Sequence, residues 1–200
     1  MEFVMSLLLG IGLSASCGFR VFVPLLVMSI FSRAGHLTLN ESFAFIGSTP
    51  ALVVFSIATV VEIAGYYIPW VDNFLDTIAT PTAFVAGVIT TGAVVHGVSP
   101  LVAGVCAIIL GGGAAIAVQS GTVVIRGVAT ATSGGIVNPA VSTSENFAAT
   151  ACSVASIALP ILVLGLFAMF AGVVFWYWRR KVKQAAGAST EGHFVEPAIP

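Results

Sequence analysis

Charge is scarce in this sequence, and its scarcity argues against an ordinary water-soluble fold. Only 8% of the 200 residues are Asp, Glu, Lys or Arg, whereas 58% are hydrophobic. A soluble domain carries about 25% charged residues, enough to cover a surface that faces water. The mean hydropathy of +1.08 therefore predicts an integral membrane protein, with the lipid bilayer as its solvent and partner.

Other absences narrow the functional classes. The net charge of −1 offers no basic surface to a nucleic acid. The three cysteines have no CxxC spacing, and no Cys/His cluster shows the spacing of a metal site, so neither a metal nor a cofactor is expected. No nucleophile–base pair or phosphate-binding loop is recognisable, and we expect the protein not to be an enzyme.

Two long stretches carry no charge at all. Residues 77–125 and residues 146–178 contain no Asp, Glu, Lys or Arg. A helix needs about 20 apolar residues to cross the hydrocarbon core. The first stretch is therefore long enough for two crossings, and the second for one long, tilted crossing.

Polar and proline-containing breaks divide the chain into helical segments. The sequence predicts an all-α fold, a polytopic transmembrane helix bundle with about six crossings, or five. The expected segments are residues 3–31, 50–70, 77–95, 101–119, 121–142 and 146–178. Arg20 and Pro24 interrupt the first segment, and Pro160 predicts a kink in the last. We expect a transmembrane domain over residues 1–183 and a disordered cytoplasmic tail over residues 184–200.

Basic residues after the last predicted crossing set its orientation. They are Arg179, Arg180, Lys181 and Lys183. Because Lys and Arg are enriched on the cytoplasmic side, we expect a cytoplasmic C-terminus in the inner (plasma) membrane. Six crossings would put the N-terminus in the cytoplasm as well. If residues 121–142 dip into the membrane and return, five crossings would put the N-terminus outside.

The sequence suggests an internal two-helix repeat at an offset of 50 residues. Pro50 follows a threonine and Pro100 follows a serine. Further along, the same offset aligns Asp76 with Arg126. Repeats with broken helices recur in transporters, although the matching residues are common types and the alignment can arise by chance. Equivalent positions near a symmetry axis would allow Asp76 and Arg126 to form an ion pair.

Two ionisable residues lie deep in predicted crossings. Arg20 is near the middle of the first segment, and Glu62 is within the second. An ionised group at that depth costs about 2.5–3.5 kcal/mol by insertion scales, so each needs a partner or a water-filled cavity. Arg20 could contact an anionic substrate, and Glu62 could carry protons. Alternatively, Arg20 and Glu62 form a static pair that locks two helices together.

Further candidate residues lie near the segment ends. Asp72 and Asp76 are four residues apart and would share one face of a helix, either as a cation site or as interfacial caps. Ser133, Gly134, Gly135 and Asn138 precede Pro139 in a stretch that breaks a helix. Broken backbone inside the membrane can bind an ion or a polar substrate; the alternative is a surface loop between segments.

Three motifs span most of the chain: Gly18–Pro24, Val71–Asp76 and Thr132–Ser142, the last followed by Glu145. On residue type alone, Glu145 could cap the helix that follows. The motifs resemble those of DUF4126, an uncharacterised bacterial family of integral membrane proteins. The resemblance implies an all-helical membrane fold, and it carries no activity over to this chain.

Two functions compete at this point. The first is a small transporter or channel with a polar pocket at broken helices, formed by Arg20, Glu62, Asp72, Asp76, Arg126 and Asn138. The second is a structural or accessory subunit of a larger membrane complex, since abundant small residues suit close helix packing. The first hypothesis fits a homo-oligomer, the second a membrane complex partner. A membrane enzyme that acts on lipid has the least support.

Overall fold

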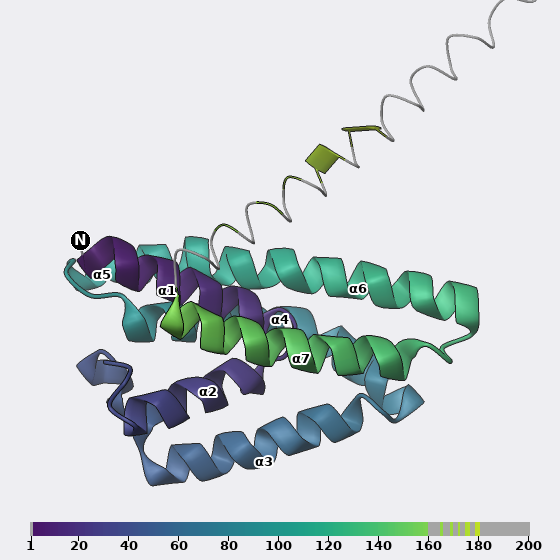
Figure 1. The fold of residues 1–200 in the computed structure, drawn as a ribbon, viewed down its shortest axis with the longest axis horizontal. Coiled ribbons are helices and arrows are strands. Elements are labelled where there is room, and N and C mark those ends of the chain that lie inside the picture. Colours follow the sequence, from purple (N-terminus) through teal and green to yellow (C-terminus); the bar gives the residue numbers. More distant parts are fainter. Residues whose placement is uncertain are drawn as a thin grey trace, which may run out of the picture. The chain divides into compact units, whose positions relative to one another are not determined.

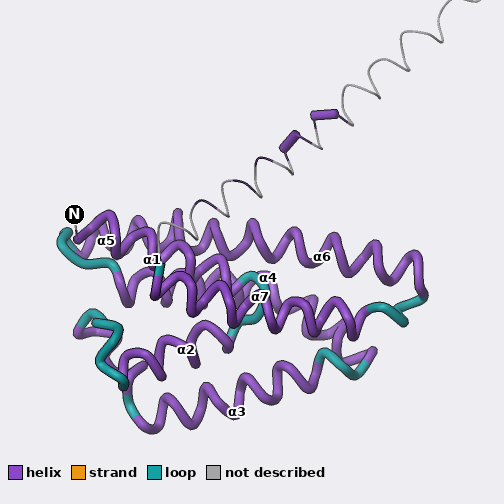
Figure 2. Tube along the Cα trace, in the orientation of Figure 1, coloured by secondary structure: helices purple, strands orange, loops and turns teal. Residues whose placement is uncertain are grey.

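The computed structural model describes residues 2–159 and positions 165, 169, 172, 175, 176, 179 and 180. Every regular element in these residues is a helix, and none is a strand (Figure 2). The all-α class that the sequence predicts is therefore confirmed. The kink predicted at Pro160 and the tail at 184–200 lie outside the described residues.

The described chain folds as a series of helices joined by short turns (Figure 1). The α-helices are α1 (Glu2–Cys17), α2 (Phe22–Arg33), α3 (Thr49–Gly65), α4 (Pro69–Val94), α5 (Pro100–Cys106), α6 (Gly113–Ser133) and α7 (Asn138–Ala158). A 3₁₀ helix, η1 (Glu41–Gly47), precedes α3, and a π-helical stretch, η2 (Ala107–Gly112), joins α5 to α6.

The first predicted segment is two helices rather than one. α1 ends at Cys17, and α2 begins four residues beyond Gly18 and runs back in the opposite direction (Figure 1). Pro24 lies in the first turn of α2, where a missing N–H removes no helical hydrogen bond. Each helix is shorter than the ~20 residues that cross a bilayer, with 16 residues in α1 and 12 in α2.

Two predicted boundaries are wrong. Residues 71–76, expected as a connection, are helical, because Pro69 opens α4 and Asp72 lies in its first turn, where the helix dipole favours an acidic residue. Residues 101–119 and 121–142, expected as separate segments, are largely one helical stretch from Pro100 to Ser133. Gly121 lies inside that stretch, since one glycine costs a helix only about 1 kcal/mol relative to alanine.

The predicted count of six crossings is not confirmed. Within the described residues, Phe74–Val94 and Pro100–Ser133 are long and apolar enough to span a membrane. A third span is possible if η1 and α3, which meet at 63°, count as one bent crossing. These lengths and compositions are compatible with membrane insertion.

The internal repeat receives no support from the helix pattern. Ser48 and Ser99 do both cap a helix with proline in its first turn, each accepting the backbone N–H of the residue three positions on. However, the turn at 66–68 that separates α3 from α4 aligns at the same offset with residues 116–118, inside α6. Only the starts of the two units are therefore alike.

Hydroxyl groups and glycines hold α1 against its neighbours. The Ser14 hydroxyl donates to the Gly87 carbonyl oxygen at 2.6 Å and lies 2.6 Å from the hydroxyl of Thr91, all within the buried α1–α4 contact. A side chain at Gly18 would lie 2.6 Å from the backbone oxygen of Ala115 in α6. Short polar and small residues thus allow backbones to approach closely, as in membrane helix packing.

Two glycines of the triple glycine at 111–113 also serve packing. A Cβ atom on Gly111 would lie 2.6 Å from the carbonyl oxygen of Gly87 in α4. By contrast, no atom lies within 4 Å of a Cβ placed on Gly113. A Cβ atom on Gly112 would lie 2.3 Å from the ring of Phe84, also in α4. The crossing of α4 and η2 therefore depends on glycine at 87, 111 and 112, and not at 113.

Residues 164–200 form a separate unit, of which few residues are described. The described positions in this unit are helical. The Arg180 guanidinium lies 4.1 Å from the ring centroid of Trp176, one helical turn earlier. Arg179 and Arg180, two of the basic residues expected after the last crossing, are among the described positions, and the orientation of the C-terminus stays a prediction.

Gly18→Ala should destabilise the fold, because the added methyl group would meet the backbone of α6. Overpacking of this kind costs about 1–3 kcal/mol, which a lower melting temperature in detergent would report. Gly113→Ala is the matched control, with open space around its Cβ, and should melt at or above the wild-type temperature. Equal melting of the two variants would contradict the close contact at Gly18.

Candidate functional site

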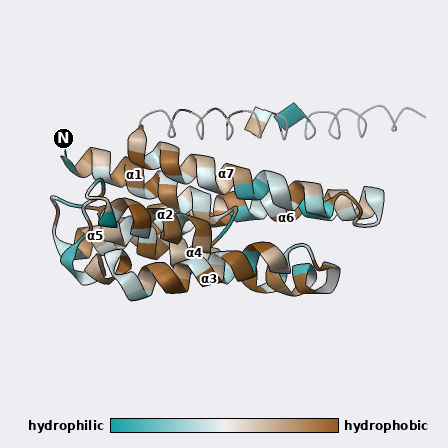
Figure 3. Cartoon of the chain, turned by 60° about the horizontal axis from the view of Figure 1, so that its bottom comes forward, coloured by the Kyte–Doolittle hydropathy of each residue, from teal (hydrophilic) through white to brown (hydrophobic). Residues whose placement is uncertain are grey.

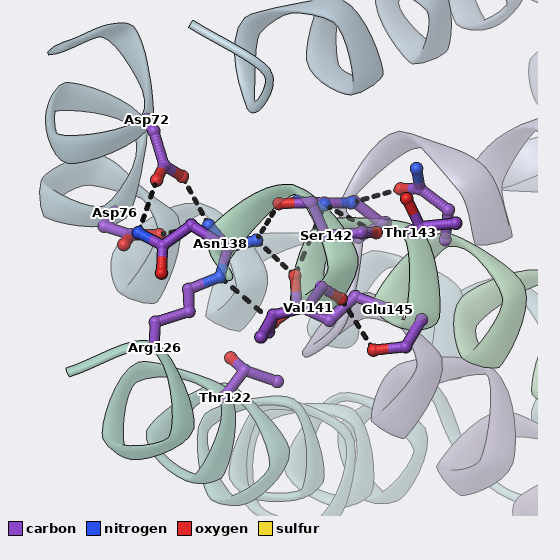
Figure 4. Close-up of polar contacts among 12 residues, drawn as sticks. Asp72, Asp76, Thr122, Arg126, Asn138, Val141, Ser142, Thr143 and Glu145 are labelled. Atoms are coloured by element: carbon purple, nitrogen blue, oxygen red, sulfur yellow. Dashed lines mark hydrogen bonds and ion pairs between the residues drawn. The ribbon is translucent and has the colours of Figure 1, made fainter. Parts of the chain in front are cut away.

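Arg126 of α6 is the centre of a buried cluster of charges (Figure 4). Its guanidinium pairs with Asp72 and, at 3.6 Å, with Asp76, both from α4. On its other side, Nε donates to Glu145 Oε1 at 3.0 Å and Nη2 donates to the hydroxyl of Ser142 at 3.2 Å, both from α7. One side chain therefore joins three helices.

The two aspartates of α4 differ in their surroundings. They are four residues apart and face the same cation, as their spacing predicts. Asp72 is 3% exposed, whereas the side chain of Asp76 is 25% exposed. Asp76 Oδ1 is nevertheless buried and has no hydrogen-bond partner. The predicted ion pair between Asp76 and Arg126 is confirmed.

Arg20 brings the break between α1 and α2 into the same cluster. It is 1% exposed, and its Nε donates to Asn146 Oδ1 at 2.5 Å. Its Nη2 donates to the Ser142 carbonyl oxygen at 3.2 Å and lies 3.3 Å from Glu145 Oε2. Its Nη1 is buried and has no partner. Glu145 is therefore shared by the two arginines.

Tyr66 lies against both arginines. The guanidinium carbon of Arg20 is 3.7 Å from the ring centroid, and that of Arg126 is 4.3 Å away. A ring face carries negative potential and attracts cations, by about 2 kcal/mol or more when the contact is desolvated. The ring at the end of α3 thus offsets part of the repulsion between two neighbouring cations.

Glu62 does not pair with Arg20, and the expected lock between these two residues is wrong. Its Oε1 accepts the backbone N–H of Val21 at 2.8 Å, and its Oε2 accepts that of Phe22 at 3.0 Å. These groups open α2, where unpaired N–H groups and the helix dipole attract an anion. Glu62 of α3 therefore stabilises the first turn of α2 at the chain break.

The stretch before α7 contributes one residue to the cluster. Gly134 and Gly135 have φ angles of +61° and +88° and form an exposed turn, while Ser133 binds the Ala129 carbonyl oxygen of its own helix. Asn138 Nδ2 lies 3.4 Å from Asp72 Oδ2 and 3.1 Å from the Thr130 hydroxyl. The surface-loop alternative is thus correct for Gly134 and Gly135, whereas Ser133 is the last residue of α6. Of the four candidates, Asn138, the first residue of α7, alone reaches the charges.

Three contributors escaped the sequence prediction: Tyr66, Ser142 and Asn146. α7 begins at Asn138, so Glu145 lies within the helix and not at its start as expected. Ser142, Glu145 and Asn146 are spaced three and four residues apart, which places them on one face. That spacing was available in the sequence as a signal, since apolar segments rarely carry a polar stripe.

Carboxylates outnumber cations in this region. The carboxylates are those of Glu62, Asp72, Asp76 and Glu145, and the guanidinium groups are those of Arg20 and Arg126, so the formal sum is −2 with every group ionised. A buried charge is costly unless it is paired. No group of three Cys, His, Asp or Glu side chains among the described residues could hold a metal ion. The arrangement suits a proton, a monovalent cation or a polar solute.

The family model described as "Domain of unknown function (DUF4126)" matches residues 7–180. The chain belongs to the DUF4126 family. The match covers every residue of the charge cluster and confirms the resemblance carried by the three sequence motifs. No curated protein and no solved structure matches the chain.

Arg126→Gln should destabilise the fold strongly, because Asp72, Asp76 and Glu145 would lose a shared cation. Removing one partner of a buried pair costs about 3–5 kcal/mol. Adding Asp72→Asn should recover about 0.5–3 kcal/mol as a coupling energy. The free energies of unfolding in detergent of the wild type, the two single variants and the double variant would give this coupling energy. Glu41→Gln, at an exposed position, is the control that should leave the free energy of unfolding unchanged. Strictly additive effects would show that Asp72 and Arg126 do not interact.

Proposed function

We propose that the chain is a small multi-pass membrane transporter whose solute site is the charge cluster around Arg126 and Glu145. The observation that carries the proposal is an excess of buried carboxylates at the level where α1 and α2 break. Ionisable residues among apolar helices mark ion and solute pathways. Burying their charge in the membrane costs free energy, and such residues persist where function requires them. A cluster that served only to join helices would need no surplus of one sign.

The break between α1 and α2 supports the same function. Half-length helices that end inside a membrane present backbone groups and side chains to a solute. Arg20 lies at this break with its Nη1 unpaired, and Asp76 has an unpaired Oδ1. One unused donor and one unused acceptor are therefore available within a single connected network.

Asp76 is the residue best suited to exchange an ion. It is the most exposed of the carboxylates that contact Arg126. Its pairing distance of 3.6 Å is too long for a hydrogen bond. A proton or a monovalent cation bound at Asp76 would remove part of the excess negative charge. This ion would therefore be the one that the protein moves across the membrane.

We also propose a topology. α3, α4, the α5–α6 stretch and α7 alternate in direction (Figure 1), and each would cross the membrane. Of these, α4 and the α5–α6 stretch are long and apolar enough to do so alone, α3 does so together with η1, and the crossing by α7 rests on the alternation of directions. α1 and α2 would enter and leave on the same side as a re-entrant hairpin. The N-terminus would then lie on the same side as the end of α7. A separate crossing after Pro160, in place of the single kinked crossing of residues 146–178 that the sequence predicts, would put the C-terminus on the opposite side.

An accessory role in a membrane complex is the second candidate. Gly104, Gly113, Gly121 and Gly127 of the α5–α6 stretch have no atom within 4 Å of an added Cβ. Exposed small residues on a long apolar helix favour close packing with another membrane helix. Purification in mild detergent separates the two candidates: a stable partner protein favours the accessory role, and the chain alone or as a homo-oligomer favours transport.

The proposed topology predicts opposite locations for the two ends of the chain. A reporter that is active only in the cytoplasm should work when fused to the C-terminus and fail when fused to the N-terminus. A reporter that is active only outside should give the reverse pattern. Two cytoplasmic ends would contradict the re-entrant hairpin and restore an even number of crossings.

Asp76→Asn should abolish ion flux, because it removes the accessible carboxylate. Wild-type protein in liposomes should move protons, Na⁺ or K⁺ faster than empty vesicles do, as read with an enclosed pH dye and with isotopic uptake. Asp76→Asn should reduce that flux to the level of empty vesicles, while Glu41→Gln keeps it. Absence of flux from folded wild-type protein for all three ions would overturn the cation proposal.

A further inference from the structure

Two buried hydroxyl groups in α2 and α3 have no partner in the protein. Ser29 of α2 is fully buried and Thr59 of α3 is 7% exposed, and neither Ser29 Oγ nor Thr59 Oγ1 forms a hydrogen bond with another residue. A serine or threonine within a helix commonly donates to the carbonyl oxygen one turn earlier. Ser56, one turn before Thr59, does so, with its hydroxyl 2.7 Å from the Leu52 carbonyl oxygen. The hydroxyls of Ser29 and Thr59 therefore point to a different kind of partner.

The surroundings of these hydroxyls are apolar. α3 is coloured as hydrophobic along much of its length (Figure 3). A groove between α3 and α4 has a volume of about 720 Å³ and an almost entirely apolar lining, which includes Ala58, Glu62 and Tyr66. Neither Ser29 nor Thr59 lines this groove. A partner for either hydroxyl therefore has to lie inside the helix bundle.

α2 and α3 lie antiparallel, with polar contacts at both ends. At one end, Glu62 accepts the N–H of Phe22, the first residue of α2. At the other end, the Arg33 guanidinium donates to the Thr49 hydroxyl at 2.9 Å. Arg33 is the last residue of α2 and Thr49 is the first residue of α3. The two helices are therefore in register along the whole of α2.

Ser29 and Thr59 lie on the faces of α2 and α3 that carry these contacts. Ser29 is seven residues after Phe22 and four before Arg33, so the three share one face of α2. Thr59 is three residues before Glu62 and shares its face of α3. At the rise of an α-helix, Thr59 lies ~4.5 Å and Ser29 ~10 Å along the pair from the level of Glu62. Water molecules with hydrogen bonds of about 2.8 Å can span the interval between the two hydroxyls.

The line of polar groups joins the charge cluster to an exposed end of the helix pair. Glu62 also accepts the N–H of Val21, the residue after Arg20. The inner end of the line therefore lies at the chain break where Arg20 enters the cluster. Beyond Ser29, α2 ends at Arg33, whose side chain is exposed. The outer end of the line therefore lies beside surface water.

The chemistry of two such hydroxyls suits water and protons. Buried polar atoms without a protein partner are ordinarily hydrogen-bonded to internal water. In a chain of water and hydroxyl groups, each oxygen accepts one proton and releases another, so every group is unchanged when a proton has passed. A metal cation instead needs several oxygens around it at one level, whereas Ser29 and Thr59 offer one oxygen each at different levels.

We propose that α2 and α3 enclose a chain of water molecules, hydrogen-bonded to Thr59 and Ser29, that carries protons between the charge cluster and the end of α2. The inference rests on the proposed transport function, and it identifies the transported ion as a proton. In the proposed topology α2 leaves the membrane on the side of the N-terminus, so the path connects the cluster to that side.

Thr59→Val and Ser29→Ala test the path, because each removes one hydroxyl with little change of shape. Ser56→Ala is the matched control, since its hydroxyl bonds within its own helix. Thr59→Ser keeps the hydroxyl and should keep the flux. In liposomes, wild type, Ser56→Ala and Thr59→Ser should move protons at equal rates, read with an enclosed pH dye, and should not take up isotopic Na⁺ or K⁺. Thr59→Val and Ser29→Ala should each be about tenfold slower, the effect of one lost hydrogen bond.

The melting temperature in detergent tests the bound water apart from transport. If Thr59 binds water, Thr59→Val loses that hydrogen bond and should melt below wild type. If the hydroxyl is dry, valine removes an unpaired polar group and the variant should melt at or above the wild-type temperature.

Three results would overturn the path and leave transport at Asp76 standing. They are flux of Na⁺ or K⁺ without protons, wild-type proton flux in either Thr59→Val or Ser29→Ala, and no fall in the melting temperature of Thr59→Val. By contrast, folded wild-type protein that moves none of the three ions would overturn the transport proposal itself, and the path with it.

Discussion

The sharing of one carboxylate by two arginines is the constraint on which the rest of this structure depends. Glu145 of α7 pairs with Arg126 of α6 and with Arg20 at the end of α1. Two cations brought this close would repel each other strongly in a medium of low dielectric. The ring of Tyr66 lies against both guanidinium groups and reduces that repulsion. Removal of Glu145 would therefore take a carboxylate from both arginines at once, leaving Asp72 and Asp76 as the carboxylates paired with Arg126.

The end of α1 lies close to the same cluster. At Gly18 the chain approaches α6 so closely that an added Cβ would lie 2.6 Å from the backbone oxygen of Ala115. Beyond Gly18 the chain turns, Arg20 reaches α7, and Glu62 of α3 accepts the first two N–H groups of α2. Backbone groups at a break need such partners when water is excluded. The charged cluster and the helix break thus stabilise each other.

Sequence reasoning found the charges but only one of their pairings. Low charge and a long apolar run predicted helices that can enter a membrane, and the equivalence of Asp76 and Arg126 predicted an ion pair that the structure contains. The sequence suggested Arg20 and Glu62 as partners. In the structure the Glu62 carboxylate instead accepts hydrogen bonds from the backbone at the start of α2. Local sequence does not show which helix start will lie beside a given carboxylate. Gly121 looked like a boundary, yet glycine weakens a helix without ending it when no proline or capping residue accompanies it.

Tyr66 connects two features that would otherwise be separate. One environment of its side chain is the apolar groove between α3 and α4, and the other is the pair of guanidinium groups. A shift of this ring would at once change the shape of the groove and withdraw negative potential from Arg20 and Arg126. Their attraction for Glu145 and Asp76 would then have to offset more mutual repulsion. The position of this one aromatic side chain therefore affects both the shape of the groove and the balance of charges in the cluster.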